Sequence, residues 1–175
     1  DEVELFNRPL DATEVLSLYQ AGSAGKCKCA TPPANMVAWY TGDDCTPTDF
    51  QGAHDGNFVG DPVCVEDWKV GGGTMAFFPS PDTYVVVNDH PDLDFGPAGP
   101  NGAGNFSIDM WVKYTGPLAP LPTHIPLVDK RTASPLRGYY LGLYNGYFLA
   151  QLADAGAGGG SSNYFDTSDP NLFVA

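Results

Sequence analysis

The chain has 175 residues, enough for one domain with a sizeable core and too few for two ordinary ones. Its 21 acidic and 8 basic residues give a formal net charge of −13, which disfavours nucleic acid as a partner because the phosphate backbone would be repelled. No apolar run approaches the roughly 18 residues that a membrane helix needs, so we expect no membrane insertion. The first residues lack a signal peptide's basic start and apolar stretch, and we expect the chain to begin after a processing site or inside a larger protein.

Residues 1–7 have the alternation of a strand. Val3 and Leu5 are apolar, and they alternate with Glu2 and Glu4. This pattern predicts a strand with one buried face and one wet face.

The next segment carries the clearest helix signals of the chain. Asp11 is a good N-cap, and Glu14, three residues later, completes a capping box. Apolar residues within 15–19 then recur at helical spacing, and Gly22 or Gly25 ends the pattern. We therefore predict one helix of roughly three turns.

The four cysteines are spread over a linker and the segment that follows it. Residues 22–35 carry small residues, a proline pair and the first two cysteines, Cys27 and Cys29. Cys45 and Cys64 come later, and the even count in an acidic, turn-rich chain favours disulfides and an oxidising compartment. A Cys27–Cys29 bridge would close a very tight ring and is disfavoured, while zinc binding and free thiols remain alternatives.

Short strand signals separated by turns fill the rest of the chain. They cover residues 36–41, 74–78, 83–87, 105–115, 125–130, 138–144 and 147–153. The last two flank Asn145-Gly146, the strongest short hairpin signal. Eight or more short strands and one peripheral helix predict an all-β protein, an antiparallel β-sandwich or jelly roll.

Several motifs together resemble laminin-G-like domains, the concanavalin-A-like jelly rolls of bacterial secreted proteins. Residues 1–22 closely resemble the closing strand and helix of that family, and from Met36 the chain is similar to the opening of the same domain. The matching pieces of the opening are VAWY at 37–40, GAHDG at 52–56, MAFF at 75–78, YVVV at 84–87, FSIDMWV at 106–112, LVDK at 127–130 and GYYLGL at 138–143.

In this chain, the segment that resembles the end of the domain thus comes before the segment that resembles its beginning. The resemblance implies a closing strand and helix at 1–25, a cysteine-containing linker at 26–35, and the first two thirds of a jelly roll at 36–175. The family's later strands, including one with a Trp-His pair, are missing, so the chain would be a window cut from tandem repeats or a subunit whose first strand completes a neighbour. Both interpretations predict that residues 1–22 close a different sandwich from the one begun at Met36.

The resemblance also implies a structural Ca²⁺ that ties the first strand to the last. The positions that match its ligands are Asp43 and Asp1, with Asp44 and Asp49 as possible helpers. A Gly-Asp-Asp loop can supply the oxygen ligands that Ca²⁺ requires. The alternative is that these residues only form turns.

Other polar and aromatic residues are weaker candidates for sites. Glu2 and Glu4 would lie about 7 Å apart on one strand face, which could suit a glycosidase pair, but the longer Glu-x-Asp-x-x-Glu strand of related glycanases is missing. We therefore expect a solvated face there and no enzymatic activity. Tyr139 and Tyr140 should face opposite ways, one buried and one exposed, with sugar stacking a possibility. The three histidines are expected at the surface: His54, His90 and His124.

The sequence therefore predicts a secreted or cell-surface, non-catalytic structural or adhesion module, one repeat of a larger surface or filament protein. Its partners would be neighbouring copies or repeats. The alternative is a Ca²⁺-dependent carbohydrate-binding domain of a secreted enzyme.

Overall fold

The computed structural model describes residues 2–22, 32–67, 69–78, 82–95, 105–116, 124–133, 136–144, 147–154 and 161–166. The chain divides into two compact units, Asp1–Val112 (unit 1) and Lys113–Ala175 (unit 2). The division lies at Val112 and not at the linker expected over 26–35, so the opening strand and helix belong to the same unit as the strands that follow Met36.

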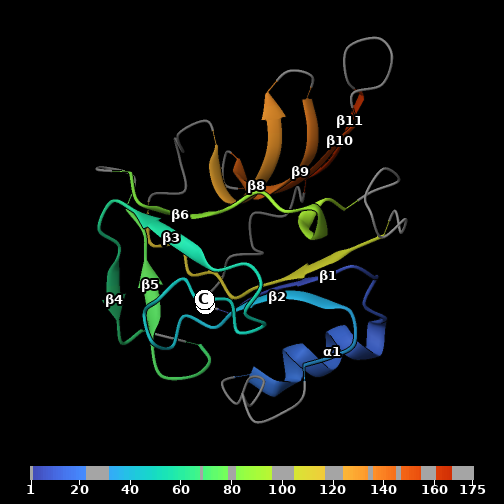
Figure 1. Cartoon of the computed structure of the whole chain (residues 1–175). Coiled ribbons are helices and arrows are strands. Elements are labelled where there is room, and N and C mark those ends of the chain that lie inside the picture. The colour runs from blue at the N-terminus through green and yellow to red at the C-terminus, as the bar shows by residue number, and fades with distance from the viewer. Residues whose placement is uncertain are drawn as a thin grey trace. The chain divides into compact units, whose positions relative to one another are not determined.

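The central sheet of unit 1 has three strands in the order β2-β1-β7 (Figure 1). β1 (Val3–Phe6) runs antiparallel to both β2 (Met36–Tyr40) and β7 (Ser107–Asp109). Leu5 lies opposite Ala38 on one side and Ile108 on the other. The opening strand is therefore the middle strand of a sheet in its own unit, where the sequence predicted that it would complete a different sandwich.

Both faces of β1 are buried. On one face Leu5 and Ala38 form a core with Leu93, against which Val3 and Ile108 pack.

On the other face of β1 lie the acidic side chains. Glu2 and Glu4 are only 6% and 1% exposed, and Trp39, opposite Glu4, is fully buried too. The expectation of a wet face was wrong because this face is covered as well, and alternation alone does not reveal whether a second face is covered.

Helix α1 (Ala12–Ala21) begins and ends as predicted. Asp11 accepts hydrogen bonds from the backbone N–H groups of Thr13 and Glu14, and the Glu14 carboxylate accepts the N–H of Asp11, completing the capping box. The helix ends at Gly22. Arg8 adds a bidentate pair with Glu14, both bonds being 2.7 Å, which raises the pKa of the guanidinium.

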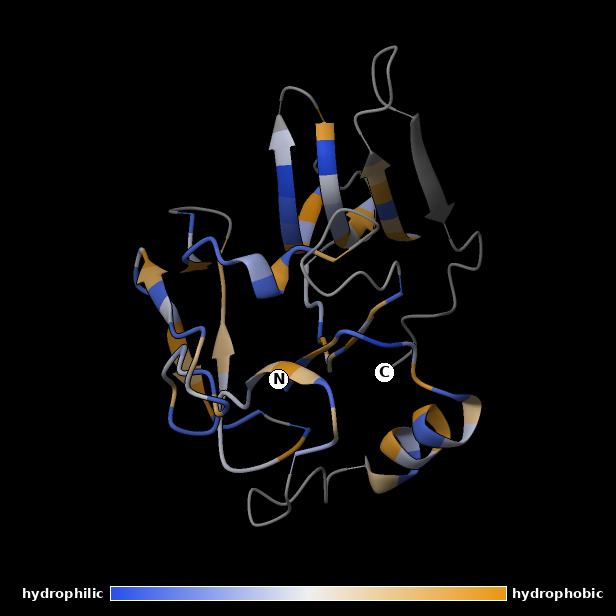
Figure 2. Ribbon diagram, turned by 45° about the vertical axis from the view of Figure 1, so that its right-hand side comes forward, coloured by the Kyte–Doolittle hydropathy of each residue, from blue (hydrophilic) through white to orange (hydrophobic). Residues whose placement is uncertain are grey.

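None of the side chains of α1 is buried. Its aliphatic residues, which have the orange colour of hydrophobic residues in Figure 2, include the exposed Val15 and Leu16, and Tyr19 is exposed as well. Tyr19 lies at a ring-centroid distance of 6.5 Å from Trp111. The apolar stripe that predicted the helix is thus largely exposed to solvent.

Two small antiparallel ribbons and a disulfide complete unit 1. β3 (Gly56–Val59) pairs with β6 (Tyr84–Val87), and β4 (Val63–Val65) pairs with β5 (Thr74–Ala76). Cys45 is bonded to Cys64 across 19 positions of sequence, a loop for which chain-entropy arguments give about 3 kcal/mol of stabilisation. The other two candidates, Cys27 and Cys29, lie outside the described residues.

Unit 2 is an antiparallel meander in the order β11-β10-β9-β8. Its strands are β8 (Ile125–Ala133), β9 (Leu136–Tyr144), β10 (Tyr147–Asp154) and β11 (Ser161–Asp166). Tyr144 lies opposite Tyr147, as the predicted hairpin requires, while Asn145 and Gly146 themselves lie outside the described residues. Gly138 has φ +111°, and a Cβ there would overlap the carbonyl of Lys130, so this strand position requires glycine.

A polar row crosses this meander. Asp129, Tyr140 and Gln151 are aligned on three adjacent strands, and Arg131 makes a bidentate pair with Asp129, donates to Gln151 at 2.6 Å and lies 4.1 Å from the Tyr140 ring centroid. Burial raises the pKa of Tyr140. Tyr139 is buried as well, so the expectation that one of the two tyrosines would be exposed was wrong.

The described protein is thus mostly β, built from small antiparallel sheets with one short helix, which confirms the coarse fold class. Among the residues described, no helix has the length and apolar character needed to cross a membrane.

Candidate functional site

The loop after β2 is organised by one buried carboxylate. The side chain of Asp49 has no exposed surface. Its Oδ1 accepts the backbone N–H groups of Trp39 at 2.8 Å and Gln51 at 3.0 Å. Its Oδ2 accepts those of Ala53 at 3.2 Å and His54 at 3.1 Å. Four charge-assisted hydrogen bonds to one side chain fix the course of the loop and the position of His54.

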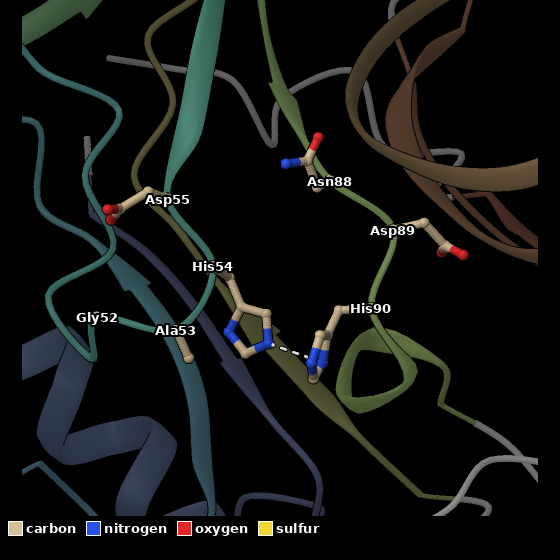
Figure 3. A pocket seen from close by; sticks show the side chains of 7 residues that line it. All are labelled: Gly52, Ala53, His54, Asp55, Asn88, Asp89 and His90. Atoms are coloured by element: carbon tan, nitrogen blue, oxygen red, sulfur yellow. Dashed lines mark hydrogen bonds between the residues drawn. The ribbon is translucent and has the colours of Figure 1, made fainter.

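The imidazole of His54 is buried beside this carboxylate, its side chain being 3% exposed. Nδ1 lies 3.5 Å from Oδ2 of Asp49, and Nε2 lies 3.4 Å from Nδ1 of His90 (Figure 3). The two rings meet edge to face with centroids 4.9 Å apart. The expectation that His54 is a surface residue was wrong, because the Asp49 loop folds it inward.

The second histidine belongs to a short 3-10 turn, η2 (Pro91–Leu93). His90 caps this turn, and its Nδ1 accepts the N–H of Asp92 at 3.2 Å. The carboxylate of Asp92 lies 3.4 Å from the same Nδ1 and 3.9 Å from Nε2 of His54. His90 is exposed, as expected.

Together His54, His90 and Asp92 place three donor atoms within 4.8 Å of one another. They come from two segments far apart in sequence, the loop after β2 and the turn after β6. An open pocket of about 250 Å³ adjoins them and is lined by Gly52, Ala53, His54, Asp55, Asn88, Asp89 and His90. Two imidazoles and a carboxylate are a donor set that borderline metal ions accept.

The predicted Ca²⁺ ligands lie elsewhere. Oδ1 of Asp43 accepts the N–H of Gly72 at 2.9 Å, and the carboxylate lies where a Cβ on Gly71 would be. Asp44 accepts from the N–H and the hydroxyl of Thr46 in a local turn. Both side-chain oxygens of Asp49, the other predicted helper, accept backbone N–H groups. Asp1 lies outside the described residues.

Sequence reasoning did not identify the histidine cluster as a site. The two histidines are 36 positions apart, and only the fold brings them together. A local signal was present in His90-Pro-Asp92, a histidine and a carboxylate two positions apart at a turn. The third histidine, His124, belongs to unit 2, where it stacks on Tyr144 with ring centroids 4.7 Å apart.

Comparison with protein-family models, with curated proteins and with solved structures found no match to this chain. The geometry of the described residues and the motifs of the sequence therefore carry the functional argument. They define a mostly β protein with a disulfide and a polar loop cluster.

Proposed function

We propose that the chain is a non-catalytic structural or adhesion module of an extracellular protein, of the laminin-G-like jelly-roll type, that works in contact with neighbouring copies or repeats. The motif series from the opening strand to GYYLGL supports the family. The Cys45–Cys64 disulfide supports an oxidising compartment, where such bonds persist.

The observation that carries this proposal is the exposed face of the β3–β6 ribbon. Val59 pairs with Tyr84, and Asn57 pairs with Val86, so these four side chains share one face. All four are exposed, and three of them are apolar or aromatic. A two-stranded ribbon is marginally stable by itself, and an apolar sheet face with open edges is a usual site of protein contact.

Contact with neighbours does not require strand exchange. β1 already lies between β2 and β7 of its own unit, so the position between these two strands is filled without a donated strand. An exchanged β1 would repeat the same contacts with another copy, since exchange replaces a segment by an identical one.

The proposal predicts self-association that depends on the ribbon. The sedimentation coefficient of the purified chain should rise with concentration, and Val86→Lys should weaken association about tenfold or more, because an ammonium group would have to be desolvated in the contact. Leu152→Lys is the matched control, since Leu152 is equally exposed (42% against 41%) but belongs to unit 2. A chain that stays monomeric at every concentration, or an equal loss in both variants, would contradict the proposal.

One observation favours the alternative of Ca²⁺-dependent carbohydrate binding. Tyr144 is exposed and stacks on His124 with an interplanar angle of 24°, which gives a flat aromatic platform of the kind that sugars pack against. On a glycan array this alternative expects binding that is lost on Ca²⁺ removal and reduced at least tenfold by Tyr144→Ala. Tyr84→Ala, another exposed tyrosine, should leave binding unchanged. Binding that survives both chelation and Tyr144→Ala would rule it out.

A further inference from the structure

We propose that His54, His90 and Asp92 form a binding site for a divalent transition-metal ion of the zinc type, distinct from the Ca²⁺ site that the family resemblance implies. This inference does not depend on the proposed function, because a metal could bind whether or not the chain associates.

The spacing of the three donor atoms fits one small ion. Nε2 of His54 and Nδ1 of His90 are 3.4 Å apart. Oδ2 of Asp92 lies 3.4 Å from Nδ1 of His90 and 3.9 Å from Nε2 of His54. Two nitrogens that each bind Zn²⁺ at about 2.0–2.1 Å with tetrahedral angles are separated by roughly 3.3 Å. A single ion can therefore reach all three donors with small side-chain adjustments.

The buried part of the site is already oriented. Asp49 Oδ2 lies 3.5 Å from His54 Nδ1 without a hydrogen bond between them, and the negative charge at that position favours the proton on Nδ1. The lone pair of Nε2 is then directed toward His90 and Asp92. Metal-binding histidines are generally held in this way, by a carboxylate or carbonyl on the ring nitrogen that does not bind the ion.

The donor set favours a zinc-type ion over Ca²⁺. Ca²⁺ takes six to eight oxygen ligands, whereas two imidazole nitrogens and one carboxylate suit Zn²⁺ and its transition-metal neighbours. Three protein ligands leave a fourth position for water or a ligand in the adjoining open pocket. Binding replaces two existing interactions of His90 Nδ1, the 3.2 Å hydrogen bond that it accepts from the Asp92 N–H and its 3.4 Å contact with His54 Nε2.

The test is thermal unfolding of the full chain with Zn²⁺, Ca²⁺ or Mg²⁺, with Cys27 and Cys29 replaced by serine so that thiolates cannot bind the metal. Zn²⁺ at about a hundred times its Kd should raise the Tm by roughly 5–10 °C, and Ca²⁺ and Mg²⁺ should not reproduce that shift. His90→Ala and Asp92→Asn should each remove most of the shift. These residues are partly or fully exposed, so the variants are expected to fold.

His124→Ala is the matched control, a histidine outside the cluster that should keep the full shift. As a second readout, Co²⁺ should give visible absorption bands without sulfur charge transfer, and His90→Ala should abolish them. The inference is overturned if Zn²⁺ produces no shift, or if the shift is equal in His90→Ala and in the parent. Loss of metal binding would leave the self-association test of the proposed function untouched.

Discussion

Asp49→Ala is expected to lower the free energy of unfolding of unit 1 by about 3–5 kcal/mol. The substitution removes the acceptor of four backbone N–H groups, two of which, those of Trp39 and His54, lie in buried surroundings. Buried donors that lose their partner keep their desolvation cost, so the loss exceeds the net value of an ordinary hydrogen bond. It would also release the His54 ring from the carboxylate that orients it.

Urea unfolding followed by tryptophan fluorescence measures this effect selectively, because the three tryptophans, Trp39, Trp68 and Trp111, all belong to unit 1. Asp44→Ala is the control, since Asp44 makes a comparable backbone bond in an exposed turn and its loss should cost about 0.5 kcal/mol. Equal destabilisation by the two substitutions would show that Asp49 does not hold the loop.

Leu5→Ala is expected to cost about 3 kcal/mol, within the 2–5 kcal/mol range for truncating a buried leucine. Leu5 lies in the middle of the central strand, where it packs with Ala38, Leu93 and Ile108. Truncation leaves a cavity bordered by three other chain segments, and two of them, β2 and β7, cannot collapse into it without breaking their pairing to β1.

The same fluorescence-detected urea titration measures this change, with Val15→Ala on the exposed helix as the control, expected within about 0.5 kcal/mol of the parent. At a concentration where the chain is monomeric, the experiment also tests whether β1 packs in its own unit. A monomer that tolerates Leu5→Ala as well as Val15→Ala would mean that β1 does not pack in its own unit.

Elements with strong local signals were predictable. The capping box of α1 requires only Asp11 and Glu14 at the right spacing, and the hairpin of unit 2 requires only a turn between two alternating runs. These features depend on neighbours within a few residues, so one sequence contains the information for them.

Features that depend on distant contacts were not predictable. β3 was missed because its sequence, Gly-Asn-Phe-Val, has little alternation and becomes a strand through pairing with β6. The burial of Glu4 beside Trp39 requires that this face of the sheet be covered, which no local pattern shows. The histidine cluster likewise joins two loops 36 positions apart, so the residue types were visible but their proximity was not.

The helix between β1 and β2 has a consequence for engineering of the chain. A ten-residue helix is marginal in water by its own propensity, and α1 buries none of its side chains to compensate. Leu10, just before the helix, is tied to the sheet by the 2.9 Å bond from its N–H to Ser107 Oγ. The connection from Phe6 to Met36 is therefore the natural place to lengthen, cut or graft the polypeptide, because foreign sequence inserted there would leave the packed interior of unit 1 undisturbed.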